Sequence, residues 1–111
     1  MSSRNDADRA ARNEALFRRV NERVEDINKA FESILAEADF FCECSDIECM
    51  EKIHMSLADY EALRQDSTHF AVKPGHEESE SERVIEHRTG YVIVEKFGRA
   101  GERAEQLDPR E

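Results

Sequence analysis

Three cysteines fall within eight positions of the segment Phe40-Phe41-Cys42-Glu43-Cys44-Ser45-Asp46-Ile47-Glu48-Cys49. Cys42 and Cys44 are two residues apart, so on an extended strand their side chains point to the same face. Cys49 follows after four more residues, which is enough for a turn to fold it back. Zinc binds thiolates in a tetrahedron at about 2.3 Å, so three converging sulfurs favour a fourth ligand from elsewhere. The segment therefore predicts a zinc site that pins the fold.

Four histidines could complete this site. His76 follows Pro74-Gly75, a rigid turn at the end of an expected strand, and we favour it as the fourth ligand. His54 is separated from Cys49 by about 16 Å of strand at about 3.3 Å per residue. His69 and His87 lie in expected strands that give no sign of convergence. Asp46, Glu43 or a water molecule remain alternatives to His76.

Other interpretations of the three cysteines also apply. Cysteine packs readily as a small hydrophobe, but acidic neighbours at positions 43, 46 and 48 are not typical of an apolar core. A CxC pair can form a reducible disulfide, with Cys49 as the resolving thiol of a redox switch. A catalytic zinc would need an open position and a general base, for which Glu43 or Glu77 could be nominated. Since the chain has no HExxH or deaminase signature, we expect a structural zinc and no enzyme.

A long helix is predicted before the cysteines, over residues 10–38. Apolar residues alternate at spacings of three and four along it, which gives a coiled-coil seam with no Gly or Pro inside. The seam consists of Phe17, Val20, Val24, Ile27, Phe31, Ile34 and Ala38, and Leu16 and Leu35 widen it. We expect residues 1–9 to be disordered and the helix to form a homodimer through the seam.

After the helix, residues 39–97 predict a zinc-stapled α+β domain with a small antiparallel sheet of about five short strands. Ser56 is typical of a helix N-cap, and a short helix to about Gln65 is expected between the second and third strands. Thr89-Gly90 between two alternating runs predicts a two-residue hairpin. Residues 98–111 are polar, contain Gly101 and Pro109, and are expected to form a flexible tail.

The composition restricts the partners. The 111 residues carry 26 acidic against 16 Lys and Arg side chains, a net charge of −10. This balance opposes general binding to nucleic acid and to anionic membranes, and it favours a basic protein partner. No apolar run is long enough to span a membrane, and no signal-peptide core follows Met1. The odd number of cysteines favours a reducing compartment, so we expect a cytoplasmic protein.

The order of these motifs resembles an uncharacterised family of short bacterial proteins of the high-GC Gram-positive type. The resemblance rests on the CxC-x4-C cluster, on Ile53 to Arg64, on Phe70 to Glu77 with its Pro-Gly-His-Glu run, and on Tyr91 to Lys96. The opening helix, Asn13 to Arg23, is also similar. The resemblance covers roughly residues 12 to 97 and groups Cys42, Cys44, Cys49 and His76 as one set, but it implies no activity.

These features favour a non-catalytic, zinc-stabilised protein-interaction or regulatory module. A thiol or zinc redox sensor is the first alternative. A zinc-knuckle protein associated with nucleic acid or the ribosome is the second. For that second alternative, Arg18, Arg19 and Arg23 would supply a basic patch on the helix, although Glu22, Glu25 and Asp26 surround it.

Overall fold

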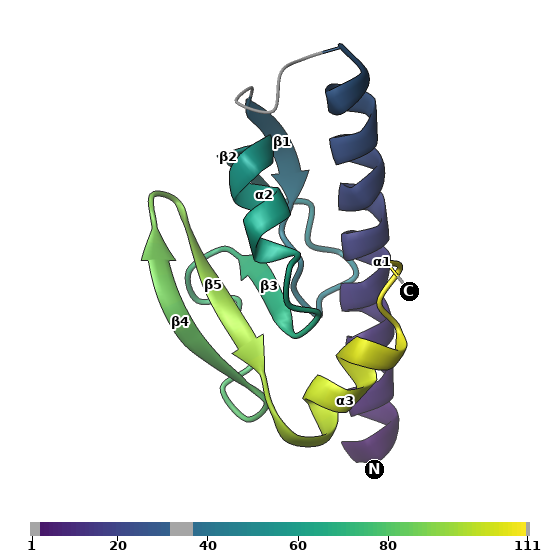
Figure 1. The fold of residues 1–111 in the computed structure, drawn as a ribbon. Coiled ribbons are helices and arrows are strands. Elements are labelled where there is room, and N and C mark those ends of the chain that lie inside the picture. The colour runs from purple at the N-terminus through teal and green to yellow at the C-terminus, as the bar shows by residue number, and fades with distance from the viewer. Residues whose placement is uncertain (1–2, 32–36, 111) are drawn as a thin grey trace.

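The computed structural model describes residues 3–31 and 37–110 and shows an α+β fold with a long N-terminal helix (Figure 1). Helix α1 (Ser3–Phe31) runs along one side of the molecule. It is followed by β1 (Glu37–Phe41), β2 (Lys52–Ser56), α2 (Leu57–Leu63), β3 (His69–Val72), β4 (Glu82–Arg88), β5 (Tyr91–Lys96) and α3 (Gly98–Gln106). The predicted fold class, including the short helix between the second and third strands, is confirmed. Within the described residues, no helix combines the length and the apolar composition that crossing a bilayer requires.

The five expected strands form two small sheets rather than one. β1 pairs with β2, and β5 lies between β3 and β4, with every pair antiparallel. Glu43 links the two sheets at the open edge of β3. Its N–H donates to the carbonyl of Ala71 at 2.8 Å, and its carboxylate accepts the N–H of Ala71 at 3.2 Å. This link replaces a continuous ladder, so the strand edge is still satisfied.

Local sequence signals place the short elements as predicted. Ser56 caps α2, since its hydroxyl accepts the N–H of Asp59 at 3.0 Å. The β4–β5 hairpin turns at Thr89-Gly90, where Gly90 has a φ of +84° that favours glycine. Along β5, Tyr91 to Val94 are all buried because this strand is central in its sheet.

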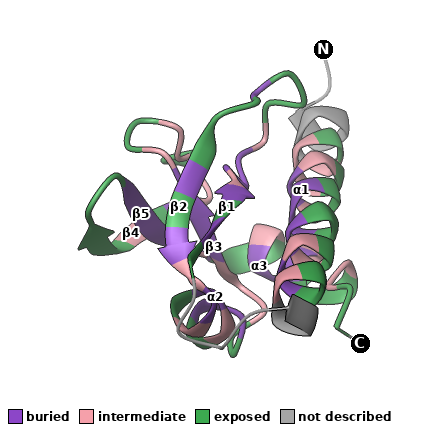
Figure 2. Ribbon diagram, turned by 90° about the horizontal axis from the view of Figure 1, so that it is seen from above, coloured by how far each residue is buried: buried purple, intermediate pink, exposed green. Residues whose placement is uncertain are grey.

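Helix α1 contacts the rest of the fold through a largely polar face. Between positions 8 and 28, its buried residues are Glu14, Phe17, Arg18, Asn21 and Glu25. Figure 2 shows the resulting stripe of buried residues on the inner side of α1 and exposed residues on its outer side.

The residues of the expected coiled-coil seam are therefore partly buried and partly exposed. Phe17 is buried and Val24 packs partly against the core, whereas Val20 and Ile27 are exposed. Ala38 belongs to β1, where it pairs with Met55, because the helix does not extend to it. Ile34 and Leu35 lie outside the described residues. The face of α1 that packs against the fold is therefore set by the ion pairs and hydrogen bonds of its polar side chains.

Arg18 is one of these inward side chains, which corrects its predicted place in an exposed basic patch. It is 1% exposed, and its guanidinium lies 3.6 Å from the centre of the Phe70 ring. Its Nη1 donates to the carbonyl of Ser67 at 2.7 Å, and its Nη2 donates to the carbonyl of His69. Arg18 thus fastens α1 to the turn that enters β3. A cation over an aromatic face contributes about 1 to 2 kcal/mol when desolvated.

Both ends of the chain are more regular than the sequence indicates. α1 begins at Ser3, within the stretch expected to be disordered, and α3 occupies the expected flexible tail. The two glycines of α3 lower its helix propensity. At Gly101 an added Cβ would lie 3.0 Å from the carbonyl oxygen of Lys96, so the absence of a side chain relieves a tight contact there. An ion pair of 3.4 Å between Asp8 and Arg103 joins α3 to α1. Packing between the two helices therefore stabilises segments that are weak alone.

Beyond α3, arginines hold the chain end against α1 and α2. Arg110 pairs with Glu22, Glu25 and Glu61 at 2.8 to 2.9 Å. Buried Arg64 pairs with Glu22 at 2.6 Å and with Asp108 at 2.5 Å. Charge pairs of this kind between distant segments are not visible in the periodicity of a sequence.

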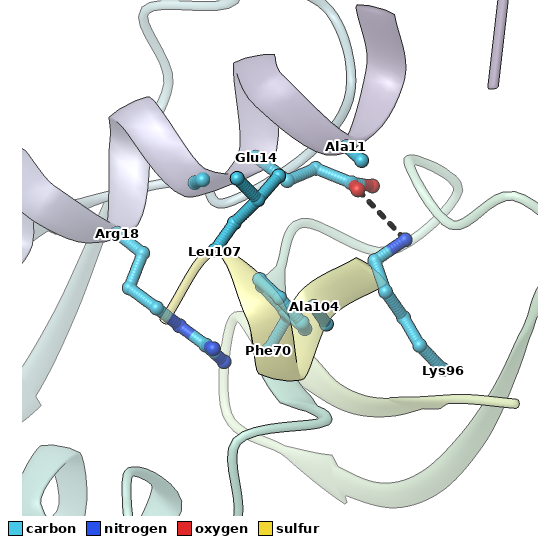
Figure 3. A pocket seen from close by; sticks show the side chains of 8 residues that line it. Ala11, Glu14, Arg18, Phe70, Lys96, Ala104 and Leu107 are labelled. Carbon is cyan, nitrogen blue, oxygen red and sulfur yellow. Dashed lines mark ion pairs between the residues drawn. The ribbon is translucent and has the colours of Figure 1, made fainter. Parts of the chain in front are cut away.

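A buried charge cluster holds the N-terminal half of α1 on the second sheet. Lys96 Nζ lies 2.7 Å from Glu14 Oε1 and 2.6 Å from Glu82 Oε2, and all three side chains are at most 4% exposed. Figure 3 shows Glu14 and Lys96 facing one another beside Ala104 of α3. The other oxygen of Glu14, Oε2, has no hydrogen-bond partner among the described residues. One ammonium cannot neutralise two buried carboxylates, and burial, with the charge of Glu82, raises the pKa of Glu14 well above its usual range.

This cluster predicts that stability falls as pH rises. The ordinary pKa of a glutamate is 4.5, and Glu14 in the folded protein keeps its proton above that pH. Glu14 in the unfolded chain loses its proton near pH 4.5. The free energy of unfolding therefore falls as pH rises from there through the folded pKa. We expect Glu14→Gln to match the wild type at pH 5 and to exceed its free energy of unfolding by about 1 kcal/mol or more at pH 8. Urea unfolding at the two pH values measures this difference. Exposed Glu80→Gln is the control, and identical pH profiles for wild type and Glu14→Gln would contradict the prediction.

Candidate metal centre

The structure brings together all four ligands that the sequence predicts. The sulfurs of Cys42, Cys44 and Cys49 and a ring nitrogen of His76 all lie within 4.8 Å of one another. The cysteines come from the loop between β1 and β2, and the histidine comes from the loop between β3 and β4. The three cysteines are buried and His76 is partly exposed, so the cluster lies just beneath the surface.

The distances around His76 fit a tetrahedral ion. Nδ1 of His76 lies 3.6 Å from the sulfur of Cys42 and 3.6 Å from the sulfur of Cys49. For bonds of about 2.3 Å to sulfur and about 2.05 Å to nitrogen, a tetrahedral angle places the two ligand atoms about 3.5 Å apart. The imidazole is thus placed where a shared ion would require it, with Nδ1 as the donor atom.

Backbone hydrogen bonds shape both loops. The N–H of Cys42 donates to the carbonyl of Glu51 at 2.9 Å, which prolongs the β1–β2 ribbon by one step. The N–H of Cys49 donates to the carbonyl of Asp46 at 2.9 Å and closes the turn that returns the third sulfur. On the other loop, the N–H of His76 donates to the carbonyl of Lys73 at 2.9 Å. Cys42 is therefore held by the ribbon, and Cys49 and His76 are each held by a local turn.

The acidic residues considered as alternative ligands have other partners. Asp46 accepts the N–H of Glu48 at 2.9 Å and so stabilises the cysteine turn. Glu77, nominated as a general base, accepts the N–H of Gly75 at 2.9 Å, and Gly75 has a φ of +89°. Neither carboxylate belongs to the ligand cluster. The Pro74-Gly75 turn presents His76 to the cluster, as the sequence predicts.

The surroundings of the three sulfurs favour a thiolate at Cys44 and neutral thiols at Cys42 and Cys49. The N–H of Lys73 donates to the sulfur of Cys42 at 3.2 Å. A hydrogen bond with Cys42 lowers the pKa of Cys44 to about 5, and the same hydrogen bond, together with burial, raises the pKa of Cys42. Burial raises the pKa of Cys49. A divalent ion would replace the remaining thiol protons, since metal ligation requires thiolates.

Glu43 lies on the opposite side of the chain from the two cysteines that flank it. Its side chain is 0% exposed. One oxygen accepts from Tyr60 Oη at 2.9 Å and from Asn21 Nδ2 at 2.9 Å, and the other accepts the N–H of Ala71. Asn21 also accepts the N–H of Phe41 at 2.7 Å and donates to its carbonyl at 2.8 Å. Glu43 therefore connects α1, α2 and β3 to residues 42–51, the candidate metal loop, and does not belong to the ligand cluster.

This role of Glu43 was missed at the level of sequence. The alternation of an extended chain gives the signal, because it turns residue 43 away from Cys42 and Cys44. No protein-family model, curated protein or solved structure matches the chain. The interpretation of the site therefore rests on its geometry.

The other histidines lie apart from the cluster. His54 is on the exposed face of the β1–β2 ribbon, 2.8 Å from Asp39 and 2.6 Å from Glu37. His69 forms a second group with Asp66 and Glu95, at 3.5 and 3.4 Å, near the start of β3. His69 lies between the two carboxylates, and exposed acidic groups of this kind are common without a metal. His87 is exposed on β4.

Proposed function

We propose that this protein is a non-catalytic zinc-binding module that acts by binding another protein. Zinc held by Cys42, Cys44, Cys49 and His76 would fasten the β1–β2 loop to the β3–β4 loop. The observation that carries this proposal is the convergence of three sulfurs and one imidazole nitrogen within 4.8 Å.

The donor set favours zinc over the other common ions. Thiolates select zinc, copper(I) and iron–sulfur clusters, whereas magnesium, calcium and manganese prefer oxygen ligands. Three thiolates and one imidazole form a set found in structural zinc sites with tetrahedral geometry. The sulfur-to-nitrogen distances of 3.6 Å fit that geometry for a single ion.

Several features favour a structural metal over a catalytic one. Four protein ligands fill a tetrahedral zinc, so no position remains for a reacting water. Metal-assisted hydrolysis also needs a general base near that water. Glu43 is buried in the β1–β2 loop and hydrogen-bonded to Tyr60, and Glu77 accepts a backbone hydrogen bond within its own turn. These placements support a role in holding the fold.

The interpretation of the cysteines as ordinary core residues explains their burial but not their surroundings. A small hydrophobe needs neither an imidazole nitrogen 3.6 Å from its sulfur nor a backbone N–H aimed at it from 3.2 Å. Both contacts are suited to a thiolate that carries charge. They therefore favour a ligand role for Cys42 over simple packing.

Metal analysis of protein purified without chelator tests the proposal. We expect about one zinc per chain, and we expect cobalt(II) to give the intense absorption bands of a tetrahedral thiolate site. Cys42→Ser and Cys49→Ser should each lower zinc affinity by at least about tenfold, and His76→Ala should do so with a shift in the cobalt spectrum. His87→Ala is the matched control, since it removes an exposed histidine outside the cluster.

Two results would overturn the zinc assignment. The first is wild-type protein that neither contains zinc nor binds it when titrated under reducing conditions. The second is undiminished affinity in all three ligand variants. Fast loss of zinc under mild peroxide, with the wild type otherwise metal-loaded, would instead favour the redox-sensor alternative.

A further inference from the structure

The outward face of α1 is basic and partly apolar, whereas acidic side chains predominate on the rest of the described surface. Between residues 8 and 28, the exposed positions are Arg9, Arg12, Leu16, Arg19, Val20, Arg23, Asp26 and Ile27. We call these eight residues the outer face of α1. The acidic residues Glu14, Glu22 and Glu25 turn inward, where they pair with Lys96, Arg64 and Arg110. A chain of net charge −10 thus concentrates positive charge on one helix face.

The four arginines of the outer face are available for binding. Among the described residues, none of them forms an ion pair with another part of the chain. Arg9 and Arg23 are 14 positions apart, so the charged stripe extends over about 21 Å of helix at about 1.5 Å per residue. Elsewhere on the described surface, exposed carboxylates outnumber exposed lysines and arginines. The stripe therefore has acidic surroundings, which would repel a long polyanion at its borders.

Apolar side chains lie between these arginines. Leu16 is 44% exposed, Val20 is 37% exposed and Ile27 is 51% exposed. Their spacing of four and seven positions keeps them on one side of the helix. A phosphate backbone would leave such side chains without a partner, whereas the apolar face of another helix would cover them.

We propose that the outer face of α1 binds an acidic amphipathic helix of a partner protein. The carboxylates of that helix would pair with the arginines, and its apolar side chains would cover Leu16, Val20 and Ile27. This acidic partner differs from the basic partner expected from net charge alone, because local charge on the contact face decides complementarity. A homodimer through the same face would bring arginine against arginine across its twofold axis.

This inference rests on the interaction role proposed above but uses none of the metal ligands. The test measures fluorescence anisotropy of a labelled helical peptide of about 20 residues with Glu on its flanks and Leu along one stripe. The comparison probes are a Lys/Leu peptide of the same pattern, single-stranded oligothymidylate, and vesicles of phosphatidylcholine and phosphatidylserine in a three-to-one ratio. Light scattering reports the oligomeric state, and zinc content and thermal unfolding report folding.

We expect the zinc-loaded wild type to bind the Glu/Leu peptide more tightly than every other probe. R19E combined with R23E should weaken this binding at least about tenfold, and V20D should weaken it as well. K52E combined with R99E makes the same change of net charge at exposed positions outside α1, and it should change the affinity less than twofold.

The proposal would be overturned if the R19E/R23E variant and the K52E/R99E variant bound the Glu/Leu peptide with equal affinity. Tighter binding of oligothymidylate or of the vesicles would also overturn it and would assign the face to nucleic acid or membrane. A wild-type dimer that V20D makes monomeric, with no peptide binding, would assign the face to a second copy. Zinc retained without peptide binding would refute this inference alone, and peptide binding without zinc would refute only the metal site.

Discussion

Removal of zinc should lower the free energy of unfolding by about 4 kcal/mol when the free zinc concentration is about a thousand times its Kd. The reason is that zinc would join the β1–β2 loop to the β3–β4 loop through its four ligands. In the sequence, the ligands Cys49 and His76 lie on either side of the segment that contains α2 and β3. For a domain of this size, the expected fall in Tm is about 15 °C or more.

The size of this effect should depend on zinc in a defined way. Binding to the folded state alone adds about 1.4 kcal/mol for each tenfold rise in free zinc above Kd. Urea unfolding in zinc buffers with increasing chelator measures this slope. A variant that cannot bind zinc, such as Cys42→Ser, should show no slope at all.

We also predict which segments lose stability when zinc is removed. Amide hydrogen exchange should increase in the metal loop and in the turn of Lys73 to His76, because their N–H groups donate to sulfur or close the ligand turns. The β4–β5 hairpin should change less, since it holds no ligand. Stability that is unaffected by chelator in a zinc-loaded protein would contradict the role of zinc as a staple.

The sequence predicts the metal loop well because its signals are local. Cys42, Cys44 and Cys49 need only one turn to converge, and Pro74-Gly75 marks the corner that presents His76. The N-cap at Ser56 and the turn at Thr89-Gly90 are likewise set by neighbouring residues. Such features depend on backbone preferences that act within a few positions.

The sequence predicts the docking of α1 poorly because the inner face is not the most apolar one. A hydrophobic seam indicates Val20 and Ile27 as contacts, yet these residues are exposed while Glu14, Arg18 and Asn21 are buried. Each buried polar group finds its partner on a distant segment, such as Lys96, Ser67 or Phe41. Periodicity cannot report such pairs, since it scores each residue without its partner. The same limit explains why α3 was expected to be a flexible tail.

Glu43 lies in a loop that local signals predict, but its hydrogen-bond partners lie on distant segments. Its replacement should therefore lower the free energy of unfolding strongly. Glu43→Gln preserves the shape of the side chain, but an amide NH2 group, which can only donate, replaces one carboxylate oxygen. It would then face either the N–H of Ala71 or the donors Tyr60 Oη and Asn21 Nδ2. A buried donor without an acceptor costs about 1 to 3 kcal/mol, and more where a charged group was involved. We expect Glu43→Gln to lower the free energy of unfolding by about 3 kcal/mol.

The measurement is urea unfolding of Glu43→Gln beside Glu48→Gln, an exposed carboxylate of the same loop that should change stability by less than about 0.5 kcal/mol. Adding Tyr60→Phe completes a double-mutant cycle. Because one hydrogen bond is shared, the double variant should lose less than the sum of the single losses. Zinc stoichiometry should stay at one per chain, since Glu43 faces away from the sulfurs. A Glu43→Gln protein of normal stability that fails to bind zinc would show instead that this carboxylate belongs to the metal site.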